Sequence, residues 1–104
     1  MKVLITGASG NIGLHLTEHL AKEHDVIATD INLELLQEKF SDNHHISIEK
    51  LDITDVENCR DVLKNSIDWV IHLAGIPHPD SPFDQLMNLN INGSFNVLLN
   101  NSYF

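Results

Sequence analysis

Apolar residues recur along the chain in two alternating patterns: short continuous runs, and runs with helical spacing. Short apolar runs bounded by turn-forming residues are typical of strands buried in a sheet, whereas apolar residues three and four positions apart are typical of helices. The predicted elements, in chain order, are a strand over 2–6, a helix over 11–23, a strand over 26–29 that ends at Asp30, a helix over 33–40, a strand over 46–49, a helix over 55–65, a strand over 69–74, a proline-containing loop over 75–82 and a helix over 83–100.

Two of these helices have a spacing that predicts which face packs on the sheet. The inward residues are predicted to be Ile12, Leu16 and Leu20 in the first helix, and Val56, Cys59 and Leu63 in the helix over 55–65. Thr54 precedes the latter helix and is predicted to cap its N-terminus.

Strict alternation of apolar strands and helices is typical of a parallel sheet covered by helices on both faces. The predicted fold class is α/β, an incomplete doubly wound parallel sheet of four strands in the order 3-2-1-4. Such a sheet normally continues beyond its fourth strand, so the strand over 69–74 would be an open edge. The helix over 83–100 is apolar on several sides. We therefore expect residues 1–104 to be the N-terminal part of a longer domain, with a homodimer contact through that helix.

Three glycines stand at a three-residue spacing between the first strand and the first helix. Gly7 would permit a tight turn, Gly10 would let the main chain approach a pyrophosphate, and Gly13 would let the helix pack closely on the strand. The free N–H groups of the helix that begins near Asn11, and the positive end of its dipole, would face that anion. The turn therefore predicts a dinucleotide-binding site.

Asp30 ends the second strand 17 residues after Gly13, near the separation at which an acidic residue reaches the adenosine ribose of a dinucleotide. Its carboxylate would accept hydrogen bonds from two ribose hydroxyls and would repel a 2′-phosphate. Asn11, Ile31 and Asn32 supply no positive charge to hold that phosphate. NAD is therefore the predicted cofactor. The alternative is a solvated aspartate that only ends a strand.

These motifs and their order resemble those of the extended short-chain dehydrogenase/reductase family, the NAD-dependent epimerases and dehydratases. Besides the glycine turn over 6–13 and Asp30, the resemblance rests on Asp52-Ile53 after the third strand, residues 72–75 (His-Leu-Ala-Gly) at the end of the fourth, and residues 90–94 (Asn-Ile-Asn-Gly-Ser) in the last helix. It runs through nearly the whole chain, covers only the family's N-terminal part, and implies a Rossmann-like NAD-binding domain.

The resemblance also implies roles for residues outside the glycine turn. Asp52 and Ile53 would lie against the adenine, small residues after the fourth strand would let the cofactor approach, and Asn90 would help to position the active site. Their alternatives are a loop acid and a core isoleucine, small residues that ease a turn, and a buried polar residue. The predicted cofactor-binding residues are Gly7, Ser9, Gly10, Asn11, Ile12, Gly13, Asp30, Asp52, Ile53, Leu73, Ala74, Gly75 and Asn90.

In the family, the chemistry depends on a Ser or Thr and on a Tyr-x-x-x-Lys pair placed after the next strand, in which the lysine lowers the pKa of the tyrosine. Tyr103 is the single tyrosine here, and no lysine follows it. We therefore predict no catalytic residue, and interpret the chain as the NAD-binding portion of a truncated oxidoreductase or epimerase. Its intact relative would act on a sugar or another hydroxyl compound. The alternatives are a non-catalytic NAD-binding sensor or subunit, and a non-functional remnant.

Composition and residue spacing bear on whether the protein binds nucleic acid, a membrane or a metal, and on where it is located. A net charge of −9 provides no basic face for nucleic acid or an anionic membrane. The apolar runs are too short for a signal peptide or a membrane span, and the single Cys59 can form no internal disulfide, so we expect a cytoplasmic protein. Of the seven histidines, His15 and His19 are one helical turn apart, but no HExxH or CxxC spacing occurs, and no metal site is predicted.

Overall fold

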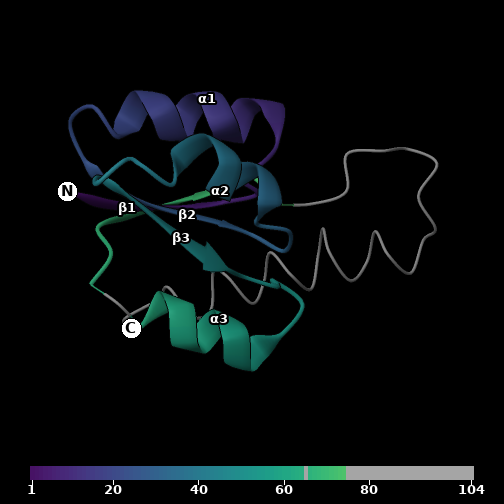
Figure 1. The fold of residues 1–104 in the computed structure, drawn as a ribbon. Helices are drawn as coiled ribbons and strands as arrows, with labels where there is room; N and C mark the ends of the chain where they lie inside the picture. Colours follow the sequence, from purple (N-terminus) through teal and green to yellow (C-terminus); the bar gives the residue numbers. More distant parts are fainter. Residues whose placement is uncertain (65, 75–104) are drawn as a thin grey trace.

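A computed structural model describes residues 1–64 and 66–74 of the chain (Figure 1). The elements, in chain order, are β1 (Lys2–Thr6), α1 (Asn11–Leu20), β2 (Asp25–Asp30), α2 (Glu34–Phe40), β3 (Ile46–Lys50), α3 (Val56–Leu63) and β4 (Trp69–His72). All four predicted strands and the first three predicted helices are therefore present. The loop over 75–82 and the helix over 83–100, with Gly75 and Asn90, lie outside the described residues.

The four strands form one parallel sheet in the order β3-β2-β1-β4, as predicted. β1 is central, because Leu4 pairs with Ile27 of β2 on one side and with Val70 of β4 on the other. The helices α1 and α2 cover one face of the sheet, and α3 covers the opposite face (Figure 1). Parallel crossovers are right-handed, so the helices that lead from β1 to β3 and the helix that leads back to β4 must lie on opposite faces.

The apolar run of β1 supplies both layers of the core. Val3 and Ile5 belong to the cluster that holds Leu36 and Phe40 of α2, whereas Leu4 belongs to a second cluster with the buried residues of α3. Successive side chains of a strand point to opposite faces, so a strand buried on both sides needs apolar residues at every position. Its burial explains why the run is continuous rather than alternating.

Helix α1 differs from its prediction in length and in its inward face. It ends at Leu20, because Lys22 and Glu23 donate their N–H groups three residues back, to His19 and Leu20, in a turn that leads into β2. Ile12 is 71% exposed, so its predicted inward position was wrong.

The fully inward positions of α1 are Gly13 and Thr17, and Leu16 and Leu20 are only partly buried against the core. The small residues at these two positions let the helix backbone come close to the strands. The apolar spacing could not reveal this face, because its central residues are not apolar.

Helix α3 begins one residue later than predicted and has a different cap. The Asp55 side chain accepts a hydrogen bond from the Asn58 N–H (3.1 Å), and Asp55, not Thr54, is the N-cap residue. Thr54 instead donates to the carboxylate of Asp52. Val56 is 40% exposed, so its inward assignment was wrong. The burial predicted for Cys59 and Leu63 is confirmed, and Val62 joins them.

Strand β4 forms one edge of the sheet within the described residues, where it pairs with β1 alone. Trp69 is 53% exposed and Ile71 is half-buried, so apolar side chains remain accessible along this strand. β4 stops two residues before the predicted end, because the Ala74 N–H leaves the backbone ladder and donates to the Thr6 hydroxyl (3.1 Å).

Two adjacent leucines of α2 provide a test of this packing. Leu36 is fully buried and Leu35 is 44% exposed. Leu36→Ala is expected to lower the free energy of unfolding by about 2–5 kcal/mol, because it removes buried methyl groups and leaves a cavity. Leu35→Ala is expected to lower it by less than about 1 kcal/mol. Urea denaturation followed by circular dichroism measures both, and equal losses would contradict the described orientation of α2.

Candidate functional site

Three strand ends meet at one edge of the sheet. Because the strands are parallel, β1, β2 and β4 all finish on the same side, at Thr6, Asp30 and His72. The glycine turn leads from β1 into α1 at this edge, and the Ala8 N–H of the turn donates to the Thr29 carbonyl of β2 (3.0 Å). Most of the residues predicted to bind the cofactor therefore come from this edge and from the loops that follow it.

Gly7 makes the tight turn that the glycine spacing predicts. Its φ of +67° lies in the left-handed region that side chains disfavour. A Cβ at this position would lie 2.8 Å from the Ala74 nitrogen and 2.9 Å from the Leu73 carbonyl carbon, so only glycine lets the end of β4 come this close. This second requirement is a contact between distant parts of the chain, and the local sequence did not indicate it.

The fold requires glycine at position 13 but not at position 10. A Cβ at Gly13 would lie 2.5 Å from the Gly7 carbonyl oxygen and 2.7 Å from the Ala8 Cα, so the first turn of α1 packs directly on the glycine turn. Gly10 has φ −72° and ψ 169°, an ordinary extended conformation. A Cβ there would meet only the Gly7 carbonyl oxygen, at 3.5 Å, which is a normal contact. The described fold therefore does not require glycine at position 10.

The N-terminus of α1 carries no capping side chain and no acidic residue in its first turn. In contrast, α3 is capped by Asp55 and has Glu57 in its first turn. An N-terminus without such groups keeps its first N–H donors and its partial positive charge available to an external anion. Asn11 and Ile12, which begin α1, are exposed.

Asp30 is held over the glycine turn by Ser9. One oxygen of its carboxylate, Oδ2, accepts the Ser9 N–H (3.1 Å) and also the Ser9 hydroxyl, and the other, Oδ1, accepts the Ile31 N–H (2.8 Å). The sequence placed both residues in the predicted cofactor set but did not indicate this contact, which joins positions 21 residues apart. The carboxylate and the glycine turn thus belong to one hydrogen-bonded unit.

Asp52 and Ile53 already have structural partners. Asp52 Oδ1 accepts from the N–H (3.0 Å) and the hydroxyl (2.6 Å) of Thr54, and its own N–H donates to the Asn58 side chain (2.7 Å). Ile53 is 3% exposed in the core cluster beneath the sheet. These contacts explain both residues as parts of the bend into α3, and the adenine contact that the resemblance implies stays a prediction.

Thr6 holds the end of β1 to the end of β4 at this edge, a role that the local sequence did not indicate. Its hydroxyl oxygen accepts the N–H groups of Leu73 (3.0 Å) and Ala74 (3.1 Å), and lies 2.6 Å from His72 Nδ1. Because both acceptor positions of the hydroxyl are filled, its proton must point to His72, whose Nδ1 is therefore the acceptor. Burial lowers the pKa of His72, in keeping with a neutral ring. The one feature of the sequence that could have indicated these hydrogen bonds is a threonine at the end of an otherwise apolar strand.

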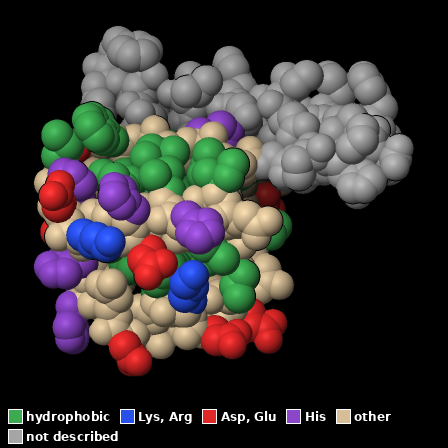
Figure 2. Space-filling model, turned by 90° about the horizontal axis from the view of Figure 1, so that it is seen from above, with side chains coloured by type: hydrophobic (Ala, Val, Ile, Leu, Met, Phe, Trp, Pro, Cys, Tyr) green, Lys and Arg blue, Asp and Glu red, His purple; other side chains and the backbone are tan. Residues whose placement is uncertain are grey.

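Other reactive groups in the described residues have structural explanations. Burial, and then the charges of Asp52 and Asp55, raise the pKa of Cys59 to about 11, so its thiol stays protonated at neutral pH and is a poor nucleophile. Histidine side chains are scattered over the face seen from the α1 side (Figure 2). No group of three or more His, Cys, Asp or Glu residues in the described part of the chain could hold a metal ion. None of the helices in that part is long and apolar enough to cross a membrane.

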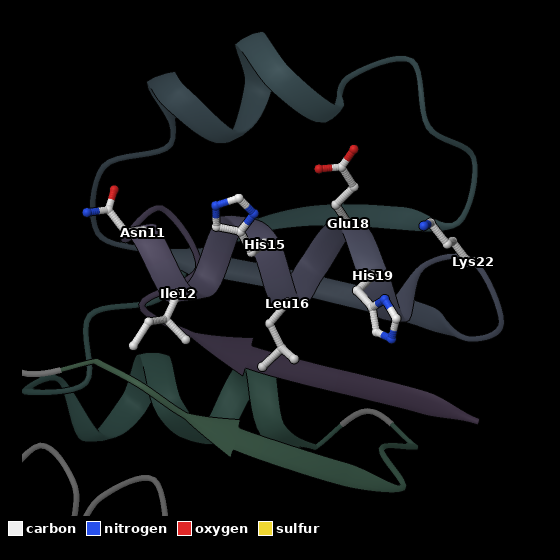
Figure 3. Close-up of a pocket in the computed structure, with 7 residues that line it drawn as sticks. All are labelled: Asn11, Ile12, His15, Leu16, Glu18, His19 and Lys22. Atoms are coloured by element: carbon white, nitrogen blue, oxygen red, sulfur yellow. The ribbon is translucent and has the colours of Figure 1, made fainter.

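A shallow hollow of about 740 Å³ lies along the exposed side of α1 rather than at the glycine turn. Ile12, Leu16 and His19 extend on one side of the helix, and His15 and Glu18 on the other (Figure 3). The hollow reaches the candidate site only at Asn11 and Ile12, where α1 begins. Its acidic residue, Glu18, lies 3.9 Å from the Lys39 ammonium and belongs to the middle of α1 rather than to a strand end, so we place the candidate site at the strand ends.

A parallel sheet with a glycine turn, an uncapped helix N-terminus and an acid at the end of β2 defines the dinucleotide-binding class of α/β proteins. The sequence pattern of the NAD dependent epimerase/dehydratase family matches residues 3–99. The chain belongs to this family, which confirms the resemblance noted in the sequence.

Individual relatives agree with this assignment. L-arabinose 1-dehydrogenase (NAD(P)(+)) of Haloferax volcanii is 32% identical over 96 residues, which cover 92% of this chain and 34% of the relative. The NAD-dependent glucose-6-phosphate dehydrogenase of the same organism is 33% identical over 93 residues, 88% of this chain and 35% of the relative. L-threonine dehydrogenase from Clostridium difficile superposes with a TM-score of 0.80 at 34% identity, over 94% of this chain and 32% of that one. The chain thus spans about a third of the length of these relatives.

The burial of His72 makes the stability of the sheet depend on pH. The folded protein binds a proton on His72 less readily than the unfolded chain does. The contribution of the neutral His72 ring to the free energy of unfolding is therefore complete above the ordinary histidine pKa of 6.5, and it is lost as the pH falls through the lowered pKa. His72→Asn keeps an oxygen acceptor for the Thr6 hydroxyl but cannot titrate. We expect its free energy of unfolding to fall less than that of the wild type between pH 7 and pH 5.

Urea denaturation across this pH range measures the difference. His15→Asn, which removes an exposed histidine of α1, controls for the loss of a ring and is expected to follow the wild type. Parallel pH profiles for His72→Asn and the wild type would contradict the lowered pKa of His72.

Proposed function

We propose that residues 1–104 form the part of an NAD site that holds the pyrophosphate and the adenosine ribose, in a dehydrogenase or epimerase of this family. The observation that carries the proposal is Gly10, a glycine that the described fold does not require, at a helix N-terminus without a cap. A residue without a side chain at that point suits a ligand that comes close to the backbone.

The first N–H groups of α1, from Asn11 and its neighbours, would donate to the pyrophosphate. No acidic residue stands in this first turn, so the partial positive charge of the helix is not neutralised there. This arrangement explains how a chain with a net charge of −9 can bind an anionic cofactor. The donors are backbone groups, and their local field does not depend on the net charge.

Asp30 would accept the hydroxyls of the adenosine ribose, and its charge would disfavour the 2′-phosphate of NADP. The residues beside it supply no compensating cation, because Asn11, Ile31 and Asn32 are neutral. We therefore propose NAD rather than NADP, although one relative's name includes both cofactors. Asp52 and Ile53 would border the adenine, and Leu73 and Ala74 would border the cofactor beyond β4.

The reaction itself would depend on residues that this sequence does not contain. No Tyr-x-x-x-Lys pair occurs in residues 1–104, so we propose that these residues bind the cofactor and do not transfer hydride by themselves. Two relatives are named as dehydrogenases of sugars or sugar phosphates, which supports a sugar or another hydroxyl compound as the substrate of the whole protein.

Gly10→Ser is expected to change NAD affinity without lowering the free energy of unfolding. Serine suits the extended conformation of Gly10 and is a better N-cap than glycine, so the free energy of unfolding is expected to stay equal or to rise by a few tenths of a kcal/mol. The added side chain would occupy the space proposed for the pyrophosphate, and NAD affinity is expected to fall at least about tenfold. Isothermal titration calorimetry and urea denaturation measure the two effects. A stable variant that binds NAD as the wild type does would refute the proposed pyrophosphate position.

Asp30→Asn tests the proposed choice of cofactor. Loss of the charge is expected to weaken NAD binding about tenfold and to narrow the difference between the dissociation constants of NAD and NADP. Asp25→Asn makes the same change at the opposite end of β2, where the carboxylate is exposed, and is expected to leave both constants unchanged. If Asp30→Asn changes the dissociation constants of NAD and NADP no more than Asp25→Asn does, Asp30 does not recognise the ribose.

A further inference from the structure

The hydrogen bonds of Asp30 leave little room for a ribose. An ionised carboxylate offers about four acceptor positions. The Ser9 N–H, the Ser9 hydroxyl and the Ile31 N–H already take three of them. A ribose that presents two hydroxyls needs two positions, one more than the carboxylate has left. Binding of the ribose at Asp30 therefore requires one internal donor to leave.

The three donors differ in their freedom to leave. The Ser9 N–H belongs to the glycine turn, whose backbone is fixed by the contacts of Gly7 and Gly13, and the Ile31 N–H belongs to the residue next to Asp30. The Ser9 hydroxyl can turn away by a change of one side-chain rotamer. It donates to Asp30 and makes no other hydrogen bond within the described residues.

We propose that the Ser9 hydroxyl is an internal substitute for one ribose hydroxyl, and that it determines how strictly the site requires a complete ribose. This inference rests on the proposed NAD site. When both ribose hydroxyls are present, Ser9 turns away and Asp30 accepts from the ligand. When one is missing, the Ser9 hydroxyl stays on the carboxylate, and no acceptor is left without a donor.

The consequence is a coupling between Ser9 and the ligand. A buried or half-buried acceptor that loses its donor is costly, and more so when the acceptor is charged. In the wild type, the Ser9 hydroxyl removes most of this cost for a ribose that lacks one hydroxyl. In Ser9→Ala nothing replaces the missing donor, so the variant should discriminate more sharply than the wild type.

The experiment compares NAD with its analogue that lacks the 2′-hydroxyl of the adenosine ribose, by calorimetric titration of the full chain. For the wild type, the analogue is expected to bind no more than about threefold more weakly than NAD. For Ser9→Ala, we expect a difference of about tenfold or more, together with NAD affinity equal to or slightly higher than that of the wild type. Ser9→Thr keeps the hydroxyl and is expected to show the wild-type ratio.

The outcomes separate this inference from the proposed function. Equal ratios for the wild type and Ser9→Ala, with NAD bound normally, would overturn the role of Ser9 and leave the NAD site intact. Lack of NAD binding by the folded wild type would overturn the proposed function, and this inference with it. If Ser9→Ala does not fold, Ser9→Cys, whose thiol is a weak donor, is expected to give an intermediate ratio; a wild-type ratio for that variant would count against the inference.

Discussion

The close backbone contact at the glycine turn is the constraint on which the rest of the structure depends. Gly7 lets the chain after β4 come within van der Waals distance of the turn after β1, and Gly13 lets α1 start directly on that turn. Thr6 joins the same strands, since its hydroxyl accepts two N–H groups from the chain after β4. Any side chain at Gly7 or Gly13 would push these elements apart. The close approach of α1, and of the chain after β4, to the turn after β1 thus depends on the absence of side chains at Gly7 and Gly13.

The same constraint explains how an acidic chain can present a site for an anion. Backbone N–H groups at the start of α1 supply the positive field, and the half-buried Asp30 carboxylate is held in place by the Ser9 N–H and hydroxyl. In the proposed site, its remaining acceptor position would take a hydroxyl group rather than a phosphate. The positive N–H groups at the start of α1 and the negative Asp30 carboxylate are therefore kept apart. The backbone of the turn fixes the N–H groups, and Ser9 fixes the carboxylate.

The sequence was sufficient for features that depend on local pattern. Continuous apolar runs predicted the four strands, their alternation with helices predicted the order 3-2-1-4, and glycine spacing predicted the turn. It was not sufficient where distant residues decide. Ile12 fits an apolar helical face, but α1 packs through Gly13 and Thr17. Thr54 is a common cap residue, but it donates to Asp52 and Asp55 caps α3 instead. The contact of Ser9 with Asp30 joins the glycine turn to β2, that of Thr6 with His72 joins β1 to β4, and no local pattern encodes either.

Thr6 and Ser9 carry the two side-chain hydroxyl groups of the glycine turn, and their numbers of hydrogen bonds distinguish a structural group from an adaptable one. The Thr6 hydroxyl accepts two backbone N–H groups and donates to His72, so each of its three hydrogen-bonding positions is filled and it cannot turn without loss. The Ser9 hydroxyl makes a single bond, to a carboxylate that its own backbone N–H also holds. Its departure would leave Asp30 in place. A fully bonded hydroxyl fixes the strand ends, whereas a singly bonded one can exchange its partner, and only the latter can respond to a ligand.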